Sequence, residues 1–324
     1  MAEILRVEHL KKYFKTPAGL LHAVDDVSFS IEKGKTLGVV GESGCGKSTL
    51  GRTILHLLDS TEGRIYFEGQ DITNVTKSQL KELRRNMQII FQDPFSSLNP
   101  RMCVSEIIQE PLEIYKAYSD KKQMLGRVAE LMNTVGLAPS LAGSYPHELD
   151  GGRRQRIGVA RALAMNPKFI VCDEPVSALD VSIQAQILNL MQDLQEELGL
   201  TYVFITHNLS VVKHISDDIL VMYLGKVVEY SSGDALFEHQ YHPYTKALLA
   251  AIAIPAIDRQ NERILLKGEI SSPVNPRPGC RFAPRCEYCT AVCRKKGPVM
   301  EEIVPGHFVA CHHVKRINGM SEEK

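Results

Sequence analysis

A glycine-rich loop is the stretch of this chain best suited to chemistry. It runs from Gly41 to Thr49 and fits the phosphate-binding pattern G-x-x-x-x-G-K-[ST]. An apolar run at 36–40 predicts a buried strand before it, and residues 50–58 predict a helix after it. In that setting, backbone N–H groups and the start of the helix bind phosphate oxygens. A chance match in a glycine-rich turn is the alternative. The residues that we assign to the phosphates and to Mg²⁺ are Gly41, Ser43, Gly44, Cys45, Gly46, Lys47, Ser48 and Thr49, with Lys47 on the β- and γ-phosphates and Ser48 on the metal.

Four further polar residues stand at the ends of apolar runs that predict strands. Asp173 and Glu174 follow one run, where Asp173 can help to hold Mg²⁺ and Glu174 can polarise an attacking water. Gln92 ends a second run and can contact Mg²⁺ or that water, and His207 ends a third and can hold the γ-phosphate. The alternatives are a plain strand-end turn for the two acids and a structural role for the histidine.

Strands that alternate with helices predict a mostly parallel sheet with helices on both faces, in which ligands lie beyond the carboxyl ends of the strands. The fold class is therefore α/β. Residues 3–35 predict an antiparallel β unit, residues 104–141 an all-helical insertion, and residues 218–230 a hairpin around Gly225. Tyr13 can stack on an adenine ring or simply pack in the β unit.

The composition excludes several classes of function. The 324 residues carry 38 basic and 38 acidic side chains, so no net charge attracts nucleic acid or anionic lipid. No targeting segment begins the chain, and no apolar run reaches the roughly 20 residues of a membrane span. We therefore expect a cytosolic chain that meets membranes through partners, and its eight cysteines are expected to be free of disulfides.

Taken together, these motifs resemble the nucleotide-binding subunit of an ATP-binding-cassette (ABC) transporter. Gly41–Thr49 resembles its Walker A loop, and residues 169–174 resemble its Walker B strand with the catalytic glutamate. Gln92 resembles the Q-loop glutamine and His207 the switch histidine, while Tyr13 resembles the adenine-stacking aromatic. The segment Ser177-Ala178-Leu179-Asp180 resembles the D-loop. The resemblance covers residues 3–235 and implies ATP and Mg²⁺ as cofactors.

The rest of the chain resembles the carboxyl-terminal extension of the oligopeptide/dipeptide importer subfamily, at residues 241–249 and 276–286. The expected domains are an ABC ATPase domain over residues 1–237, with a helical subdomain at about 93–160, and an extension over 238–324. The resemblance implies ATP hydrolysis that powers import of di- or oligopeptides from the cytoplasmic face of the membrane. It also implies a second, different ATPase subunit, two permeases and an extracytoplasmic binding protein.

One segment departs from the family pattern. Where the family signature is Leu-Ser-Gly-Gly-Gln, this chain has Leu149-Asp150-Gly151-Gly152-Arg153. In the family dimer this segment caps the ATP of the other subunit, so the carboxylate of Asp150 would repel phosphate unless Arg153 or Arg154 offsets it. Asp150 can instead serve as the N-cap of the following helix. The hypothesis is that the site that uses Asp150 turns over slowly.

Five cysteines gather near the end of the chain. Cys280, Cys286, Cys293 and Cys311 match the subfamily's iron–sulfur positions, and Cys289 is an extra residue. Four thiolates can hold a [4Fe–4S] cluster or Zn²⁺, and free thiols are the third alternative. A structural role is expected, because a small extension with little core often needs a metal.

Other functions stay open on sequence alone. Nickel, glutathione or another small solute is imported by members of the same subfamily, and some ABC ATPases act on DNA or ribosomes without any permease. Such non-transport proteins usually carry two cassettes or long coiled coils, which this sequence lacks.

Overall fold

The computed structural model describes residues 2–251, 268 and 272–320. The chain divides into two compact units. We call residues 74–205 the helical unit, and residues 2–73 together with the chain from Thr206 onward the P-loop unit.

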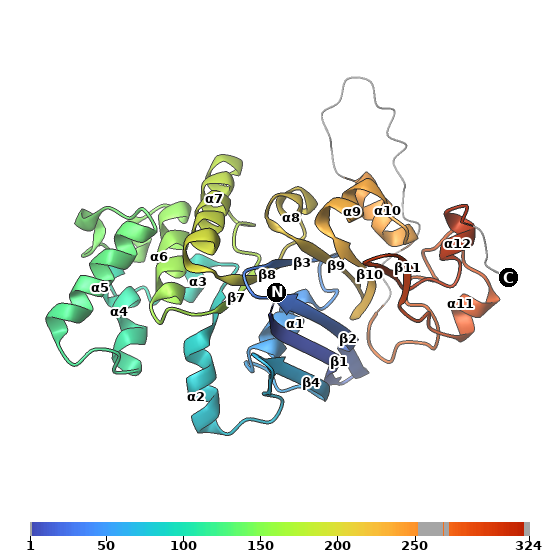
Figure 1. The fold of residues 1–324 in the computed structure, drawn as a ribbon, viewed down its shortest axis with the longest axis horizontal. Helices are drawn as coiled ribbons and strands as arrows, with labels where there is room; N and C mark the ends of the chain where they lie inside the picture. Colours follow the sequence, from blue (N-terminus) through green and yellow to red (C-terminus); the bar gives the residue numbers. More distant parts are fainter. Residues whose placement is uncertain (1, 252–267, 269–271, 321–324) are drawn as a thin grey trace, which may run out of the picture. The chain divides into compact units, whose positions relative to one another are not determined.

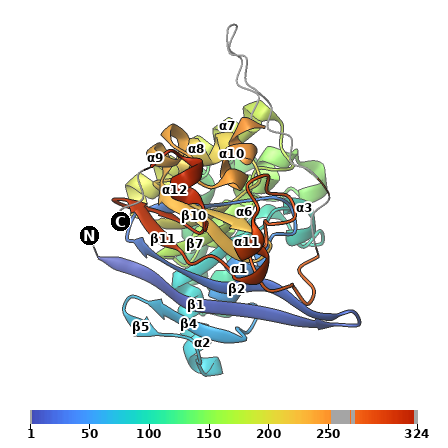
Figure 2. The same ribbon diagram turned by 90° about the vertical axis from the view of Figure 1, so that its right-hand side faces the viewer.

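The P-loop unit contains an antiparallel sheet in the order β2-β1-β4-β5. Its first two strands form one long hairpin, which Figure 2 shows together with β4. The pairing confirms the predicted antiparallel unit, but both strands are longer than the sequence indicated, because only residues 17 and 18 form the turn. The strands are β1 (Glu3–Thr16), β2 (Gly19–Glu32), β4 (Glu62–Phe67) and β5 (Gln70–Asp71).

A second group of strands in this unit carries the phosphate-binding loop. β3 (Thr36–Val40) runs parallel to β9 (Asp218–Tyr223), and β10 (Lys226–Ser232) pairs antiparallel with β9. The β9–β10 hairpin confirms the prediction around Gly225. Both residues of its turn, Leu224 and Gly225, have positive φ angles, as tight hairpin turns require. The short strands β12 (His307–Val309) and β11 (Glu301–Val304) extend this group beyond β10.

Helices of the P-loop unit cover these strands. The helix that follows the loop is α1 (Lys47–Ile54), which ends four residues earlier than expected. The others are α8 (Leu209–Ile215), α9 (Gly233–Glu238), α10 (Pro243–Ala250), α11 (Ala291–Lys295) and α12 (Val314–Ile317).

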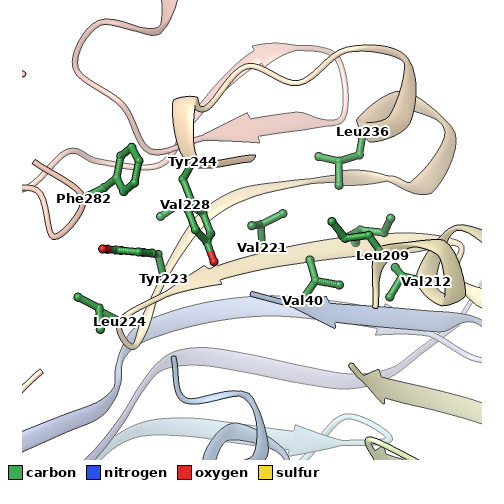
Figure 3. Close-up of a cluster of buried hydrophobic side chains, with 11 residues drawn as sticks. Val40, Leu209, Val212, Val221, Tyr223, Leu224, Val228, Leu236, Tyr244 and Phe282 are labelled. Carbon is green, nitrogen blue, oxygen red and sulfur yellow. The ribbon is translucent and has the colours of Figure 1, made fainter. Parts of the chain in front are cut away.

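The core of the P-loop unit joins segments that lie far apart in the sequence. We call the described residues from Pro243 onward the C-terminal region. Figure 3 shows Val40 at the end of β3 below Val221 of β9, with Tyr244 from α10 and Phe282, both in the C-terminal region, above them. The rings of Tyr223, Tyr244 and Phe282 pack edge-on or tilted, with centroids 4.7 to 5.6 Å apart. Because each ring is buried, the C-terminal region packs as part of this core.

The helical unit is built on three parallel strands in the order β6-β7-β8. They are β6 (Met87–Ile90), β7 (Phe169–Asp173) and β8 (Thr201–Ile205). All side chains of β7 and β8 are buried, which explains their uninterrupted apolar sequences.

Most of the chain between β6 and β7 is helical. The continuous helical pattern expected over 104–141 is interrupted after α4 (Val104–Ile114). The next helix is α5 (Lys121–Thr134), and the side chain of Asp120 caps its start. Figure 1 shows α4, α5 and α6 side by side. The helices of this unit are α2 (Lys77–Asn86), α3 (Pro94–Ser97), α4 (Val104–Ile114), α5 (Lys121–Thr134), α6 (Gly151–Leu163) and α7 (Val181–Leu198), with 3₁₀ turns at Pro139–Leu141 and Pro146–Glu148.

Among the residues that the structure describes, none of the helices combines the length and the apolar character that crossing a membrane requires.

Candidate nucleotide-binding site

The P-loop wraps around the ammonium group of Lys47. Nζ donates to the carbonyl oxygens of Gly41 and Glu42, at 2.8 and 3.1 Å, and the side chain is only 4% exposed. Gly41, Gly44 and Gly46 all have positive φ angles. The strand, loop and helix therefore have the local arrangement that the motif requires.

At two of these glycines, the backbone of another strand comes so close that a side chain would not fit. A Cβ atom at Gly41 would lie 2.2 Å from the carbonyl oxygen of Met222, and one at Gly46 would lie 2.0 Å from that of Ala23. Neither backbone atom can move aside without shifting a strand. The loop is therefore held between β9 and β2, which were not part of the sequence motif.

Tyr13, the expected adenine-stacking residue, lies on β1 with its ring stacked on His22, at a centroid distance of 3.9 Å. Its hydroxyl donates to Asp25 over 2.6 Å. Burial alone would raise the pKa of Asp25, but the bond from Tyr13 and the charges of Lys226 and Arg281 outweigh it and lower that pKa. Asp25 is thus held as a carboxylate that fixes Tyr13.

His207 has an exposed side chain just beyond β8. The preceding residue, Thr206, is buried, and its N–H donates to the carbonyl of Val39 over 3.2 Å. This bond holds the chain beside the end of β3, the strand that leads into the P-loop. Ser48 is the second residue of α1, and Cys45, which the sequence assigned to the phosphates, is buried in the loop.

In the helical unit, two predicted site residues are in contact. The amide of Gln92 donates to Oε2 of Glu174 over 3.1 Å. Asp173, one residue earlier, ends β7 and is 1% exposed. The sequence prediction placed Gln92 and Glu174 at strand ends, and parallel pairing of β6 with β7 brings these ends together.

Glu174 has an unusual backbone. Its φ angle is +51°, in the left-handed region that residues other than glycine seldom adopt. Its N–H donates to the carbonyl of Ile205 over 2.9 Å, and its own carbonyl accepts from the Ser177 hydroxyl over 3.0 Å. These bonds fix the backbone of Glu174 at the end of β7.

The segment that departs from the family signature starts helix α6. Asp150 is the N-cap, and its Oδ1 accepts from the N–H of Arg153 over 2.8 Å. The capping role that the sequence allowed is therefore confirmed. Arg153 also brings Nε to 3.4 Å from the other carboxylate oxygen, whereas Arg154 donates instead to the carbonyl of Pro146. Both Asp150 and Arg153 are more than half exposed, so their charge pair is a weak one.

The two signature glycines allow close packing against the D-loop and α7. A Cβ atom at Gly151 would lie 3.0 Å from the side chain of Leu179, and one at Gly152 would lie 2.7 Å from Cγ2 of Ile183. Asp180, the last D-loop residue, stands at the N-cap position of α7, where its side chain makes no capping hydrogen bond. Sequence reasoning assigned these glycines to ATP and missed their packing role.

The metal centre expected on the cysteine cluster has no support from the arrangement of the side chains. In the described part of the chain, no three or more His, Cys, Asp or Glu side chains are arranged to hold a metal ion. Cys280, Cys286, Cys293 and Cys311 do line one cavity of about 20 Å³. Burial, with a smaller contribution from the neighbouring cysteines, raises the pKa of Cys280 to about 12 and that of Cys286 to about 11.

Sequence reasoning also missed the residues that hold the P-loop from outside. Tyr244 accepts the N–H of Glu42 on its hydroxyl over 2.8 Å, and Arg285 forms a two-bond ion pair with the Glu42 carboxylate. Both come from beyond residue 240, and no spacing pattern links them to the loop.

Comparisons with known proteins agree with this geometry. The family profile described as "ABC transporter" matches residues 24–177, and the profile "Oligopeptide/dipeptide transporter, C-terminal region" matches residues 228–293. The oligopeptide transport ATP-binding protein AppF of Bacillus subtilis is 53% identical over 95% of this chain and 97% of its own length. OppF of the same organism, also an oligopeptide transport ATP-binding protein, is 51% identical over 95% of this chain and 96% of its own length.

Solved structures give the same fold. The ATP-binding cassette MJ0796, in a dimeric post-hydrolysis state with ADP and Pi, matches with a TM-score of 0.65 and 29% identity, covering 71% of this chain and 98% of its own. The cassette cbiO1 from Clostridium perfringens, part of the cbiONQ transporter complex, matches with a TM-score of 0.66 and 28% identity, covering 74% of this chain and 92% of its own.

The packing of Gly152 leads to a matched pair of substitutions in α6. Gly152→Ala should destabilise the protein by about 1–3 kcal/mol, because Ile183 is β-branched and its methyl cannot rotate away freely. Gly158→Ala in the same helix meets no atom within 4 Å and should stabilise it by about 0.5–1 kcal/mol. Denaturant unfolding of both variants checks this, and equal effects would contradict the packing role.

Proposed function

This chain belongs to the ABC transporter family of ATP-binding proteins, and from that membership we propose that it hydrolyses ATP to drive import of di- or oligopeptides. The observation that carries the proposal is the P-loop, whose backbone surrounds the buried ammonium of Lys47. The names of AppF and OppF favour a peptide over nickel, glutathione or another small solute. They also favour a transporter over an ABC ATPase that acts on DNA or ribosomes.

We assign the steps of hydrolysis to individual residues as follows. The P-loop and Lys47 bind the phosphates, Ser48 and Asp173 hold Mg²⁺ with Gln92, and Tyr13 stacks on the adenine ring. Glu174 orients and polarises the attacking water, and His207 stabilises charge on the γ-phosphate. The bond from Gln92 supports this role for Glu174, because it holds the carboxylate at the end of β7 beside the residue that we assign to Mg²⁺.

The proposed assembly follows from the function. We expect a second, related ATPase subunit, two membrane permeases and an extracytoplasmic binding protein, with this chain at the cytoplasmic face of the membrane. The helical subdomain over about 93–160 would transmit movement to the permeases, and residues 238–324 would form the extension typical of peptide importers. Closed and open states of the ATPase pair would then alternate with ATP binding and hydrolysis.

The test is a complex reconstituted in proteoliposomes from all five kinds of subunit. Glu174→Gln should lower ATP hydrolysis and peptide uptake at least about 100-fold while ATP binding persists, because only proton acceptance is lost. Glu197→Gln, on an exposed position of α7, is the matched control and should leave both rates unchanged. Peptide uptake that continues at the original rate in Glu174→Gln would refute the proposed role, and a wild-type complex that does not respond to peptide would refute the substrate.

We further propose that the two ATP sites of the heterodimer are unequal. The site that contains this chain's P-loop and Glu174 would hydrolyse ATP with the partner's signature, whereas the opposite site would meet Asp150. Capping and the weak pair with Arg153 support this, because neither removes the carboxylate from an exposed helix start.

Restoring the family residues tests the asymmetry. Asp150→Ser together with Arg153→Gln should raise ATP turnover of the assembled complex by about two- to tenfold, since removal of one charge repulsion is worth roughly 1 kcal/mol. Serine also caps helices, so the fold should be retained, as thermal unfolding will check. Unchanged or lower turnover would mean that the Asp150 site is not impaired.

A metal on Cys280, Cys286, Cys293 and Cys311 stays a prediction, and no step of hydrolysis depends on it. Support comes from the small cavity that these four cysteines line together. A [4Fe–4S] cluster, or Zn²⁺ as the alternative, would staple the C-terminal region together.

Elemental analysis of anaerobically purified protein decides the matter. We expect iron, or else zinc, near stoichiometry, and Cys286→Ser should lose most of it. Cys289→Ser is the matched control and should keep the metal, because Cys289 does not line the shared cavity. Neither metal near stoichiometry in the unaltered protein would exclude the site.

A further inference from the structure

One loop of the C-terminal region brings two arginines to the elements that we assign to the nucleotide. We call residues 279–286 the arginine loop. Its side chains Arg281 and Arg285 are only 8% and 7% exposed, so each needs a partner for its charge. Both partners are carboxylates in the first 45 residues of the chain.

Arg285 holds Glu42, the residue that follows Gly41 in the P-loop. Its two terminal nitrogens lie 2.7 and 3.0 Å from the two carboxylate oxygens, a bidentate pair that fixes direction as well as distance. Tyr244 meanwhile accepts the N–H of Glu42. The C-terminal region therefore holds both the backbone and the side chain at the start of the P-loop.

Arg281 acts on the other nucleotide-binding element. It donates to the Asp25 carboxylate and to the carbonyl of Leu224. Asp25 is the acceptor for the hydroxyl of Tyr13, and Lys226 lies 3.6 Å from the same carboxylate. The chain of contacts thus runs from Arg281 through Asp25 to the ring that we assign to adenine.

The arginine loop is itself held firmly. Phe282, between the two arginines, is 2% exposed and packs edge-on against Tyr223 with centroids 5.2 Å apart (Figure 3). The backbone closes on itself through the N–H of Arg285, which donates to the carbonyl of Phe282 over 3.0 Å. A rigid loop can fix its partners precisely, as positioning residues must.

We propose that Arg281 and Arg285 are positioning residues for ATP: Arg285 keeps the Glu42 carboxylate from repelling the phosphates, and Arg281 holds Tyr13 in place through Asp25. The physical reason for the first part is charge. Glu42 lies in the loop that we assign to a highly anionic triphosphate, and in a partly buried site the repulsion is poorly screened. The proposal rests on the assignment of the P-loop and Tyr13 to ATP.

Calorimetric titration of the full-length chain with ATP and with inorganic tripolyphosphate tests the Arg285 pair. Arg285→Ala should weaken both ligands about tenfold, equivalent to about 1.4 kcal/mol, by leaving Glu42 uncompensated. Glu42→Gln leaves a positive Arg285 beside the loop and should bind tripolyphosphate several-fold more tightly. The double variant should bind within about twofold of the original protein, because it restores the balance of charge.

That rescue separates positioning from mere structural support. If Arg285 only braced the fold, the double variant would have lost the same brace and would bind no better than Arg285→Ala. Failure of the double variant to recover, or unchanged binding in Arg285→Ala, would overturn the proposal for this pair. If Arg285→Ala does not fold, the variants Arg285→Lys and Glu42→Gln test the same proposal. Arg285→Lys should keep most of the affinity for both ligands, and Glu42→Gln should bind tripolyphosphate more tightly. Unchanged affinity in Glu42→Gln would then overturn the proposal.

Comparison of ATP with tripolyphosphate tests the proposed role of Arg281, because only ATP carries an adenine ring. Arg281→Ala should weaken ATP about tenfold but tripolyphosphate less than twofold, because Asp25 and Tyr13 act only on the adenine end. Equal losses for the two ligands, or none, would overturn this part. Arg294→Ala on α11 is the matched control, as its exposed side chain belongs to the same region, and it should bind both ligands normally. An unaltered protein that binds no ATP would instead refute the proposed function itself.

Discussion

Backbone crowding around the phosphate-binding loop is the constraint on which the P-loop unit depends. Carbonyl oxygens of Met222 and Ala23 approach the positions of Gly41 and Gly46 so closely that no side chain fits. The loop is therefore not an independent motif on a scaffold. Strands β9 and β2 both help to shape the loop through these close approaches. In addition, Gly225, which follows β9, donates its N–H to the carbonyl of Cys45 over 2.8 Å. Any change that moves these strands changes the loop.

Charged side chains around the phosphate-binding loop are also paired with residues from distant parts of the chain. Lys47 lies in the loop, where its ammonium donates to the carbonyl oxygens of Gly41 and Glu42. The carboxylates that lie nearby are instead matched by arginines from the far end of the chain, Glu42 by Arg285 and Asp25 by Arg281. Buried charges are costly without partners, so the unit separates the cation that serves the ligand from the cations that serve the fold.

Sequence reasoning succeeded where a function depends on local order along the chain. The P-loop, the strand-end acids and the β9–β10 hairpin each carry their own residues, and their elements formed as expected. It did not find Arg285 or Tyr244, because 243 and 202 residues separate them from Glu42. The resemblance of their segments to the importer extension does not say which loop they contact. The packing of Gly152 against Ile183 was hidden for a related reason, since the signature explained both glycines already. The metal centre stays a prediction, because it depends on the directions of four thiols, which their spacing in the sequence does not determine.

Glu174, which we propose as the catalytic residue, has a backbone conformation that is unfavourable in free energy. A left-handed backbone at a residue other than glycine is unfavourable by about 1–2 kcal/mol. Two backbone hydrogen bonds, to Ile205 and from Ser177, offset that cost and lock the turn that follows β7. Glycine would adopt the same turn without strain, yet it would bring no carboxylate to Gln92. The strained backbone is therefore consistent with the catalytic role that we propose for this side chain, because strain of this kind is retained where the surrounding structure supports a functional group.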